Sequence, residues 1–384
     1  MIIVIADDLT GATELGGIGL RYNLRVEITN QIGVSIAMGT DLLIINTDTR
    51  SMALAEAIVQ LEKVLDWIKG LSYTFLFKKV DSVLRGYVVA ETVAQMSVTG
   101  VQRALLLPAN PRLGRTIRKG KYYIQDKPIN ETAFSSDPEF PVKSADVLTM
   151  LGAQGEVQIK SHHEVFPKKG LVIGELSSEE DMHKWLQIAP EDVLFVGGSS
   201  AFIAFLEHRT KSVKNEKADE NQVFTGFKRP SLYVCGSNYE KSIQRIQAWR
   251  MANEPVCYLP VIQSGKMIDE GELLRWKERV NAALTYHQKA IIAFDNELVS
   301  KMDLAPGFLR DSMAKIMNDL LNELSIQELV IEGGATAGAI LAHRQIGQLK
   351  PLEELAPGVI RCSIPKDPEI WITLKPGSYP WYML

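Results

Sequence analysis

Four polar clusters in the first 110 residues together hold most of the residue types that a phosphoryl-transfer site needs. They lie at residues 7–11, 46–50, 78–86 and 108–110, and each directly follows a short apolar run. Such runs are typical of strands buried on both faces of a parallel sheet. Because ligands of open α/β sheets bind beyond the carboxyl ends of the strands, we expect the clusters to converge on one crevice.

The first cluster contains two adjacent acids, Asp7 and Asp8. Neighbouring side chains in a strand point to opposite faces. We therefore expect one aspartate to face the crevice, with Asp8 as the candidate, and the other to cap the following helix or bind a backbone amide. In the alternative interpretation, both acids only favour the positive end of the helix dipole.

Basic residues follow the next strands and predict an anionic substrate. Arg50, Lys79 and Arg85 stand at these strand ends. An arginine can bind a carboxylate through two parallel hydrogen bonds, and a lysine acts as a point charge. Asp81 and Ser82 add acceptors suited to hydroxyl groups. This combination favours a small polyhydroxy acid, whereas in the alternative interpretation the basic residues are merely solvated.

The second half contains three glycine turns after expected strands, at residues 236–237, 333–336 and 377–378. Glycine lets the backbone approach a phosphate, and the N–H groups at a helix start attract it. One such turn alone is more often a plain tight turn, but three in one domain favour nucleotide binding. The sequence has no G-x-x-x-x-G-K-S/T motif, which excludes a P-loop protein, and no G-x-G-x-x-G motif at a strand end, which disfavours a dinucleotide site.

The order of these runs predicts an α/β fold with two domains, each with a largely parallel sheet flanked by helices. Helices are expected at 12–22, 51–69 and 85–98 in the first half. A length of 384 residues favours two domains, and the polar tract 211–222 places them at 1–220 and 221–384. Residues 108–141 break the pattern and predict either a binding loop or a solvated excursion; their basic residues are Arg112, Arg115, Arg118, Lys119 and Lys121.

The composition limits the classes of binding partner and the cellular compartment that we expect for this chain. The formal net charge of -4 argues against a general nucleic-acid binder, and no apolar run reaches the ~18 residues needed to cross a membrane. The N-terminal run is short and lacks a basic flank, so we do not expect a signal peptide. Cys235, Cys257 and Cys362 have no C-x-x-C spacing, which disfavours structural zinc and disulfides. We therefore expect a cytoplasmic protein without nucleic-acid or membrane partners.

Six ordered motifs resemble the four-carbon acid sugar kinase family over nearly the whole chain. IADDLTGA at 5–12 and KKVDSVLRG at 78–86 are similar to the family's N-terminal signatures, and LPANPRLGRT at 107–116 is similar to its Pro-and-Gly-Arg segment. CGSN, EGGATAG and LKPGSY are similar to its nucleotide-binding turns. Members are ATP-dependent kinases with an N-terminal acid-sugar domain and a C-terminal ATP domain. They phosphorylate a terminal hydroxyl of acids such as threonate or erythronate.

The resemblance also implies which residues form the sites. Substrate contacts fall on Asp8, Arg50, Lys79, Val80, Asp81, Ser82 and Arg85, and Asp8 would orient or deprotonate the acceptor hydroxyl. ATP contacts fall on Ser237, Gly333, Gly334, Ala335, Thr336 and Gly377, with Mg²⁺ bridging the phosphates and no metal ligand assigned. We also expect a homodimer as one possible assembly. Ala335 replaces the family's usual acid, so a sugar-acid sensor and a phosphatase-like homologue without ATP-dependent activity stay open.

Overall fold

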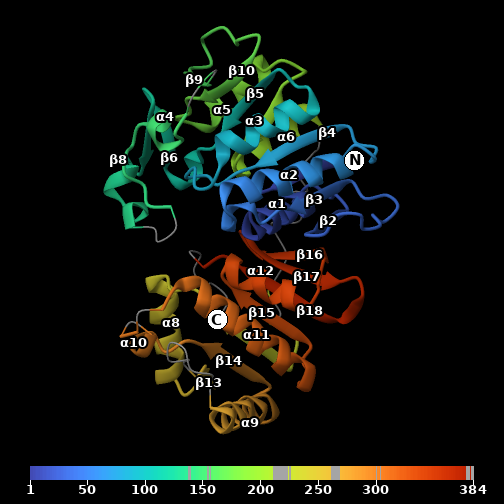
Figure 1. The fold of residues 1–384 in the computed structure, drawn as a ribbon, viewed down its shortest axis with the longest axis vertical. Helices are drawn as coiled ribbons and strands as arrows, with labels where there is room; N and C mark the ends of the chain where they lie inside the picture. The colour runs from blue at the N-terminus through green and yellow to red at the C-terminus, as the bar shows by residue number, and fades with distance from the viewer. Residues whose placement is uncertain are drawn as a thin grey trace. The chain divides into compact units, whose positions relative to one another are not determined.

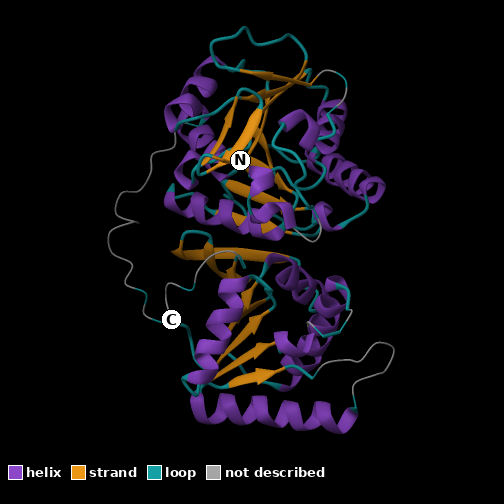
Figure 2. Ribbon diagram, turned by 90° about the vertical axis from the view of Figure 1, so that its left-hand side faces the viewer, coloured by secondary structure: helices purple, strands orange, loops and turns teal. Residues whose placement is uncertain are grey.

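The structure is a computed structural model that describes residues 1–136, 140–153, 155, 157–210, 224, 226–260, 269–299, 301–302, 304–377 and 381. The chain divides into two compact units, Met1–Glu216 and Lys217–Leu384. The domain boundary expected at residue 220 and the polar tract 211–222 lie outside the described residues. In each unit the strands form a layer with helices on both sides (Figure 1; Figure 2).

Unit 1 is built on a parallel sheet with the strand order β2-β3-β1-β4-β11-β5-β10-β9. Its strands are β1 (Ile2–Ala6), β2 (Val26–Thr29), β3 (Leu42–Asn46), β4 (Phe75–Lys79), β5 (Arg103–Leu107), β9 (Val157–Lys160), β10 (Gly170–Gly174) and β11 (Leu194–Gly197). Its helices are α1 (Leu9–Arg21), α2 (Leu54–Ile68), α3 (Val88–Thr99), α4 (Val147–Met150), α5 (Glu179–Ile188) and α6 (Ser199–Arg209). The expected parallel α/β architecture is therefore confirmed for this unit.

The position of β1 explains where a ligand site forms. All five β1 residues are apolar and buried, and apolar residues of α2, including Leu61 and Leu65, pack on Ile3 and Ile5. The chain adds β2 and β3 on one side of β1 and then places β4 on its other side. Such a reversal of strand order opens space beyond the carboxyl ends of the strands concerned. The residues that follow β1, β3 and β4 lie at this point.

Two segments of unit 1 differ from the expectation. The strand that was expected to end before the polar cluster 78–86 extends from Phe75 to Lys79, because Lys78 is fully buried and its Nζ lies 2.5 Å from Oε2 of Glu91 on α3. Residues 108–141 are not irregular throughout, since they contain a small antiparallel sheet. Its strands are β6 (Arg115–Arg118), β7 (Lys121–Ile124) and β8 (Lys127–Pro128), beside the 3-10 helices η2 (Pro111–Leu113), η3 (Ile129–Glu131) and η4 (Ala133–Ser136).

Unit 2 has the strand order β13-β14-β12-β15-β18-β17-β16. The five strands β13, β14, β12, β15 and β18 pair in parallel, as expected. Strands β17 and β16 add an antiparallel edge that was not predicted. The strands are β12 (Ser231–Cys235), β13 (Val256–Tyr258), β14 (Lys289–Ala293), β15 (Glu328–Glu332), β16 (Gln348–Ala356), β17 (Val359–Ile364) and β18 (Asp367–Lys375). The helices are α8 (Glu240–Met251), α9 (Glu270–His287), α10 (Asn296–Val299), α11 (Pro306–Glu323) and α12 (Gly334–His343).

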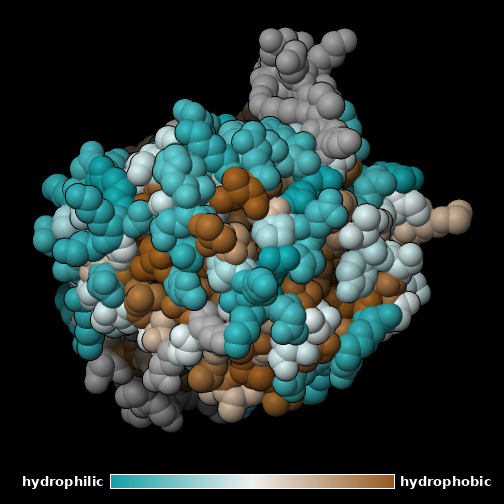
Figure 3. Space-filling model, turned by 90° about the horizontal axis from the view of Figure 1, so that it is seen from above, coloured by the Kyte–Doolittle hydropathy of each residue, from teal (hydrophilic) through white to brown (hydrophobic). Residues whose placement is uncertain are grey.

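No helix in the described part of the chain is long and apolar enough to cross a membrane. The face seen in Figure 3 carries hydrophilic residues around small separate groups of hydrophobic ones. Cys235 and Cys362 are buried, Cys257 is half-buried, and all three are free thiols.

Candidate functional site

Asp7 and Asp8 follow β1 and take different environments. Asp7 is 3% exposed. Asp8 caps α1, since its Oδ1 accepts a hydrogen bond of 2.9 Å from the backbone N of Gly11. The side chain of Asp8 is nevertheless 20% exposed, and its Oδ2 accepts no hydrogen bond from the described residues. The same aspartate therefore caps the helix through Oδ1 and leaves Oδ2 without a hydrogen bond from the described residues.

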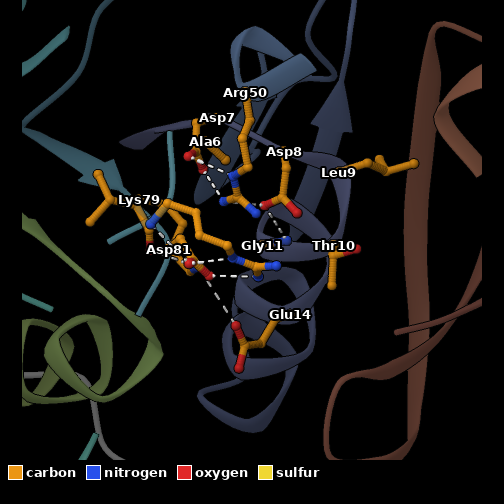
Figure 4. Close-up of polar contacts among 12 residues, drawn as sticks. Ala6, Asp7, Asp8, Leu9, Thr10, Gly11, Glu14, Arg50, Lys79 and Asp81 are labelled. Atoms are coloured by element: carbon orange, nitrogen blue, oxygen red, sulfur yellow. Dashed lines mark hydrogen bonds and ion pairs between the residues drawn. The ribbon is translucent and has the colours of Figure 1, made fainter. Parts of the chain in front are cut away.

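Arg50 joins the two acids from the 3-10 helix η1 (Thr49–Ser51), which follows β3. Its Nε and Nη2 donate to Asp7 at 3.0 and 2.6 Å, and Nη2 also donates to Oδ1 of Asp8 at 3.0 Å (Figure 4). Burial opposes the charge, but Asp7 and Asp8 outweigh it and raise the pKa of Arg50 well above its usual value. Among the described residues nothing accepts a hydrogen bond from Nη1.

Lys79, the last residue of β4, approaches the first turns of α1. Its Nζ donates to the backbone oxygen of Val80 at 3.1 Å and lies 3.7 Å from Oε2 of Glu14 (Figure 4). Gly11 makes this approach feasible, because a Cβ atom there would lie 2.7 Å from Oδ1 of Asp8 and 2.9 Å from Nζ of Lys79. The ammonium group and the Asp8 carboxylate thus flank the same point. Glu14 carried no signal in the sequence beyond its place on a helix.

The turn after β4 is stabilised by hydrogen bonds to the carboxylate of Asp81, which lies within the turn. Asp81 accepts hydrogen bonds from Arg85 through Nε at 2.8 Å, Nη2 at 3.1 Å and the backbone N at 3.1 Å. Burial raises the pKa of Asp81, but the charges of Arg85 and Arg50 outweigh it and hold the pKa below its usual range. These bonds and the positive φ angles of Leu84 (66°) and Gly86 (86°) delay the helix, which begins at Val88 rather than at residue 85.

The small antiparallel sheet brings further residues to this turn. Arg115 of β6 donates to Oγ of Ser82, and the buried Tyr122 of β7 donates to the backbone oxygen of Ser82. The guanidinium groups of Arg85 and Arg115 lie 5.9 and 5.8 Å from the ring centre of Phe134. The sequence indicates Arg115 only as one of several basic residues in its segment, and it gives no indication of Tyr122 or Phe134.

The glycine turns of unit 2 converge. A Cβ atom on Gly377 would lie 2.5 Å from Oγ of Ser237, and one on Gly236 would overlap the side chain of Thr336. Gly333 lies between them, with a φ of 101° that favours glycine, and its N donates to the oxygen of Lys375 at 2.9 Å. The turns after β12, β15 and β18 therefore form one backbone-lined cluster.

The start of α12 adds donors to this cluster. Gly334, Ala335 and Thr336 occupy its first turn, where backbone N–H groups lack partners within the helix and carry partial positive charge. Thr336 is buried and Ala335 is exposed. This geometry suits an anionic group such as a phosphate.

The buried side chain of Glu332 makes hydrogen bonds to residues beside the glycine turns. It is fully buried, and its Oε1 accepts hydrogen bonds from Nζ of Lys375 at 2.6 Å, Oγ of Ser242 at 2.8 Å and Nε1 of Trp381 at 2.9 Å. Oγ of Ser242 also lies 3.2 Å from the oxygen of Gly377. The carboxylate thus connects β15, β18 and α8, which border the three glycine turns.

The acids near this cluster do not form a metal site. Glu332 is paired with Lys375, and Asp295, which follows β14, accepts from the backbone N atoms of Glu297 and Leu298. Within the described ranges no group of three or more His, Cys, Asp or Glu side chains could hold a metal ion. The residues around Ala335 therefore do not fit a metal held mainly by the protein.

Comparison with known proteins assigns a class to each unit. Residues 2–205 match the family described as a sugar-binding N-terminal domain, and residues 232–379 match the nucleotide-binding C-terminal domain. Two crystal structures, of proteins from Salmonella typhimurium and Haemophilus influenzae, share the fold with TM-scores of 0.75 and 0.73. Each covers 98% of this chain and 96% of its own, at 18% and 20% identity.

The sequence relatives narrow the class further. A Salmonella typhimurium protein named D-threonate kinase is 32% identical over 90% of this chain and 84% of its own length. A Bordetella bronchiseptica protein of the same name is 26% identical, over 93% and 88%. A Pseudomonas fluorescens protein named 3-oxo-tetronate kinase is 22% identical, over 98% and 93%. This chain belongs to the four-carbon acid sugar kinase family.

Proposed function

We propose that this chain is an ATP-dependent kinase that phosphorylates a terminal hydroxyl of a small four-carbon sugar acid such as threonate or erythronate. Unit 1 would bind the sugar acid and unit 2 would bind ATP. The observation that carries the proposal is the cluster around Asp8 and Arg50, in which Oδ2 of the partly exposed Asp8 and Nη1 of Arg50 have no hydrogen-bond partner among the described residues. The identity to a relative named D-threonate kinase supports the same substrate class.

In unit 1 some residues would bind the charged group of the substrate, and others would shape the site around its hydroxyl groups. Nη1 of Arg50 and the ammonium group of Lys79 would bind the substrate carboxylate. Asp81, Ser82 and Arg85 would shape the site and accept or donate bonds to hydroxyl groups, with the backbone of Val80 held by Gly197 at 3.1 Å. Because Asp81 and Arg85 are already paired with each other, they would act mainly by fixing the turn.

Asp8 would receive the acceptor hydroxyl. Its Oδ1 is fixed by Gly11 and Arg50, so Oδ2 is held in one orientation and could accept the hydroxyl hydrogen. Phosphoryl transfer depends mainly on positioning and charge stabilisation, so Asp8 would orient the hydroxyl and take its proton late in the reaction.

In unit 2 the turns of Ser237, Gly333–Thr336 and Gly377 would cradle the ATP phosphates through backbone N–H groups. Without side chains at the glycines, the phosphate oxygens could approach the backbone closely. Mg²⁺ would arrive with the nucleotide and keep phosphate and water ligands. No step proposed for these residues depends on a metal held by the protein.

A thermal-shift titration of the full chain with Mg-ATP and with a panel of four-carbon sugar acids tests the proposal. A ligand at ~100 times its dissociation constant should stabilise the protein by ~2.7 kcal/mol. Shifts with ATP and with one or more sugar acids are expected. Absence of any shift with ATP would contradict the kinase.

One observation favours a second candidate, a sugar-acid-binding sensor without transfer activity. Ala335 is exposed in the first turn of α12, where the family usually has an acid, and the nearby acids are engaged elsewhere. A sensor predicts a thermal shift with the sugar acid and none with Mg-ATP, so the same titration separates the two candidates.

A further inference from the structure

Both carboxylate oxygens of the buried Asp7 bind Arg50. Oδ2 of Asp7 accepts a hydrogen bond from Nε at 3.0 Å, and Oδ1 accepts one from Nη2 at 2.6 Å (Figure 4). The side chain of Asp7 is 4% exposed and that of Arg50 is 12% exposed. Two parallel hydrogen bonds between a carboxylate and a guanidinium group fix the plane of the guanidinium group as well as its position. Asp7 therefore offers little surface to a ligand, but it sets the orientation of the arginine.

The backbone around Asp7 and Arg50 supports the same arrangement. The N of Arg50 donates to the backbone oxygen of Asp7 at 3.1 Å. Thr47, which follows β3, donates through its N and its Oγ1 to the oxygen of Ala6, each at 2.9 Å. Gly86 packs against the pair, because a Cβ atom there would lie 3.3 Å from Cγ of Arg50 and 3.4 Å from Oδ2 of Asp7. The segment that carries Arg50 is thus fixed to the end of β1.

Asp7 also determines how Asp8 shares the guanidinium group. An arginine side chain has five N–H donors. Nε donates to Asp7, and Nη2 donates to Asp7 and, at 3.0 Å, to Oδ1 of Asp8. Asp8 thereby receives a single hydrogen bond from Arg50. If Asp7 were absent, Nε and Nη2 would lose their shared acceptor, and the guanidinium group would be free to bind both oxygens of Asp8, including Oδ2.

We propose that Asp7 is a positioning residue for the transfer reaction. It holds Arg50 so that Nη1 is presented to the carboxylate of the sugar acid and Oδ2 of Asp8 is kept for the acceptor hydroxyl. The inference rests on the proposed function, and it gives the two adjacent acids different tasks. Asp8 receives the hydroxyl group, whereas Asp7 acts on the substrate through Arg50.

Asp7→Asn tests this role, because asparagine has nearly the same size but lacks the negative charge. Calorimetry with a four-carbon sugar acid and with Mg-ATP, and steady-state kinetics, would be carried out on the full chain. We expect the dissociation constant of the sugar acid to rise about tenfold or more and kcat to fall about tenfold, since a displaced binding group misplaces the substrate. The dissociation constant of Mg-ATP should stay within about twofold.

The matched control is Asp41→Asn. Asp41 binds Nε and Nη2 of Arg25 at 2.9 and 3.0 Å, in the same two-bond arrangement, but this pair is exposed and lies beside the amino ends of β2 and β3. The control should change neither dissociation constant nor kcat.

A double-mutant cycle separates positioning from a direct or purely structural role. Arg50→Gln removes the guanidinium group, so Asp7 has nothing left to orient. Adding Asp7→Asn to Arg50→Gln should therefore change the dissociation constant of the sugar acid by less than about twofold. Additive losses across the cycle would overturn the proposal.

The remaining outcomes also decide the question. Unchanged sugar-acid affinity and kcat in Asp7→Asn would overturn the positioning role and leave the proposed kinase intact, and equal losses of sugar-acid and Mg-ATP affinity would also overturn it. If Asp7→Asn does not fold, Arg50→Lys replaces it, because lysine keeps the charge but lacks the planar fork that binds both acids. A tenfold loss of sugar-acid affinity in Arg50→Lys would support the role, and wild-type affinity would overturn it. A wild-type protein that binds no sugar acid would overturn the proposed function, and this inference with it.

Discussion

Nζ of Lys375 lies 2.6 Å from Oε1 of Glu332, and both side chains are buried beneath the glycine turns. Removing one partner of a buried ion pair leaves an uncompensated charge. We expect Glu332→Gln to lower the free energy of unfolding by about 3 kcal/mol, measured by urea unfolding followed through tryptophan fluorescence.

The exposed pair of Asp66 and Lys69, 2.8 Å apart, provides the control. Asp66→Asn should cost less than about 1 kcal/mol, because water screens such pairs. Equal effects of Glu332→Gln and Asp66→Asn would show that the buried pair does not support the turns.

The close approach of Gly377 to Ser237 predicts a second effect. In Gly377→Ala the new methyl group would lie 2.5 Å from Oγ of Ser237 and force the turns apart. We expect the dissociation constant of Mg-ATP to rise about tenfold or more, at a cost of ~1.4 kcal/mol. Gly338→Ala is the control, since a Cβ atom at Gly338 meets nothing within 4 Å. Unchanged ATP affinity in Gly377→Ala would rule out the cradle.

Arg115 is expected to position Ser82 and so to affect the sugar acid rather than ATP. Arg115→Ala removes its bond to Ser82 and its contact with Phe134. In steady-state kinetics we expect KM for the sugar acid to rise about tenfold, the cost of one charge-assisted hydrogen bond, while KM for ATP stays within twofold. Arg118→Ala is the control, because Arg118 contacts Asp126 and Tyr123 instead. An equal rise in both KM values would contradict a role at the sugar-acid site.

Asp81 should contribute a pH-dependent part of the stability. Its native pKa lies below the usual value, and in an unfolded chain a carboxyl of this type titrates near pH ~4. The ionised Asp81 therefore stabilises the fold above pH ~4, and this contribution is lost as the pH falls through the native pKa. We expect Asp81→Asn to be less stable at neutral pH and to lose less stability on acidification below pH ~4. Equally steep losses in both proteins would contradict the assignment.

Local sequence patterns predicted the strand ends well, because a buried parallel strand must be apolar and the next residue is free to be polar. Asp8, Arg50 and Gly333 were located in this way. The pattern failed where a distant partner decides the outcome. Lys78 lies inside β4 because Glu91 neutralises it. Likewise, β16 is a largely half-exposed strand, and the apolar residues of the buried strand β17 are interrupted by Arg361 and Ser363, so neither strand shows a long apolar run.

Contacts between residues far apart in the sequence could not be predicted from local sequence patterns either. Arg115 reaches Ser82 only because β6 and β7 fold into a hairpin. The adjacency of Asp7 and Asp8 indicated two roles, but it could not show that Asp8 caps α1 while its side chain stays partly exposed. Such assignments depend on the arrangement of several elements around one residue.

Turnover of the wild type and of Asp8→Asn tests the central claim most directly. Phosphorus NMR would follow the conversion of ATP and a four-carbon sugar acid into ADP and a phosphorylated acid. We expect the wild type to form this product and Asp8→Asn to be slower by roughly 10²–10⁴-fold while a thermal shift still reports sugar-acid binding. Wild-type turnover in Asp8→Asn, or no phosphorylated acid from the wild type with any member of the panel, would contradict the account.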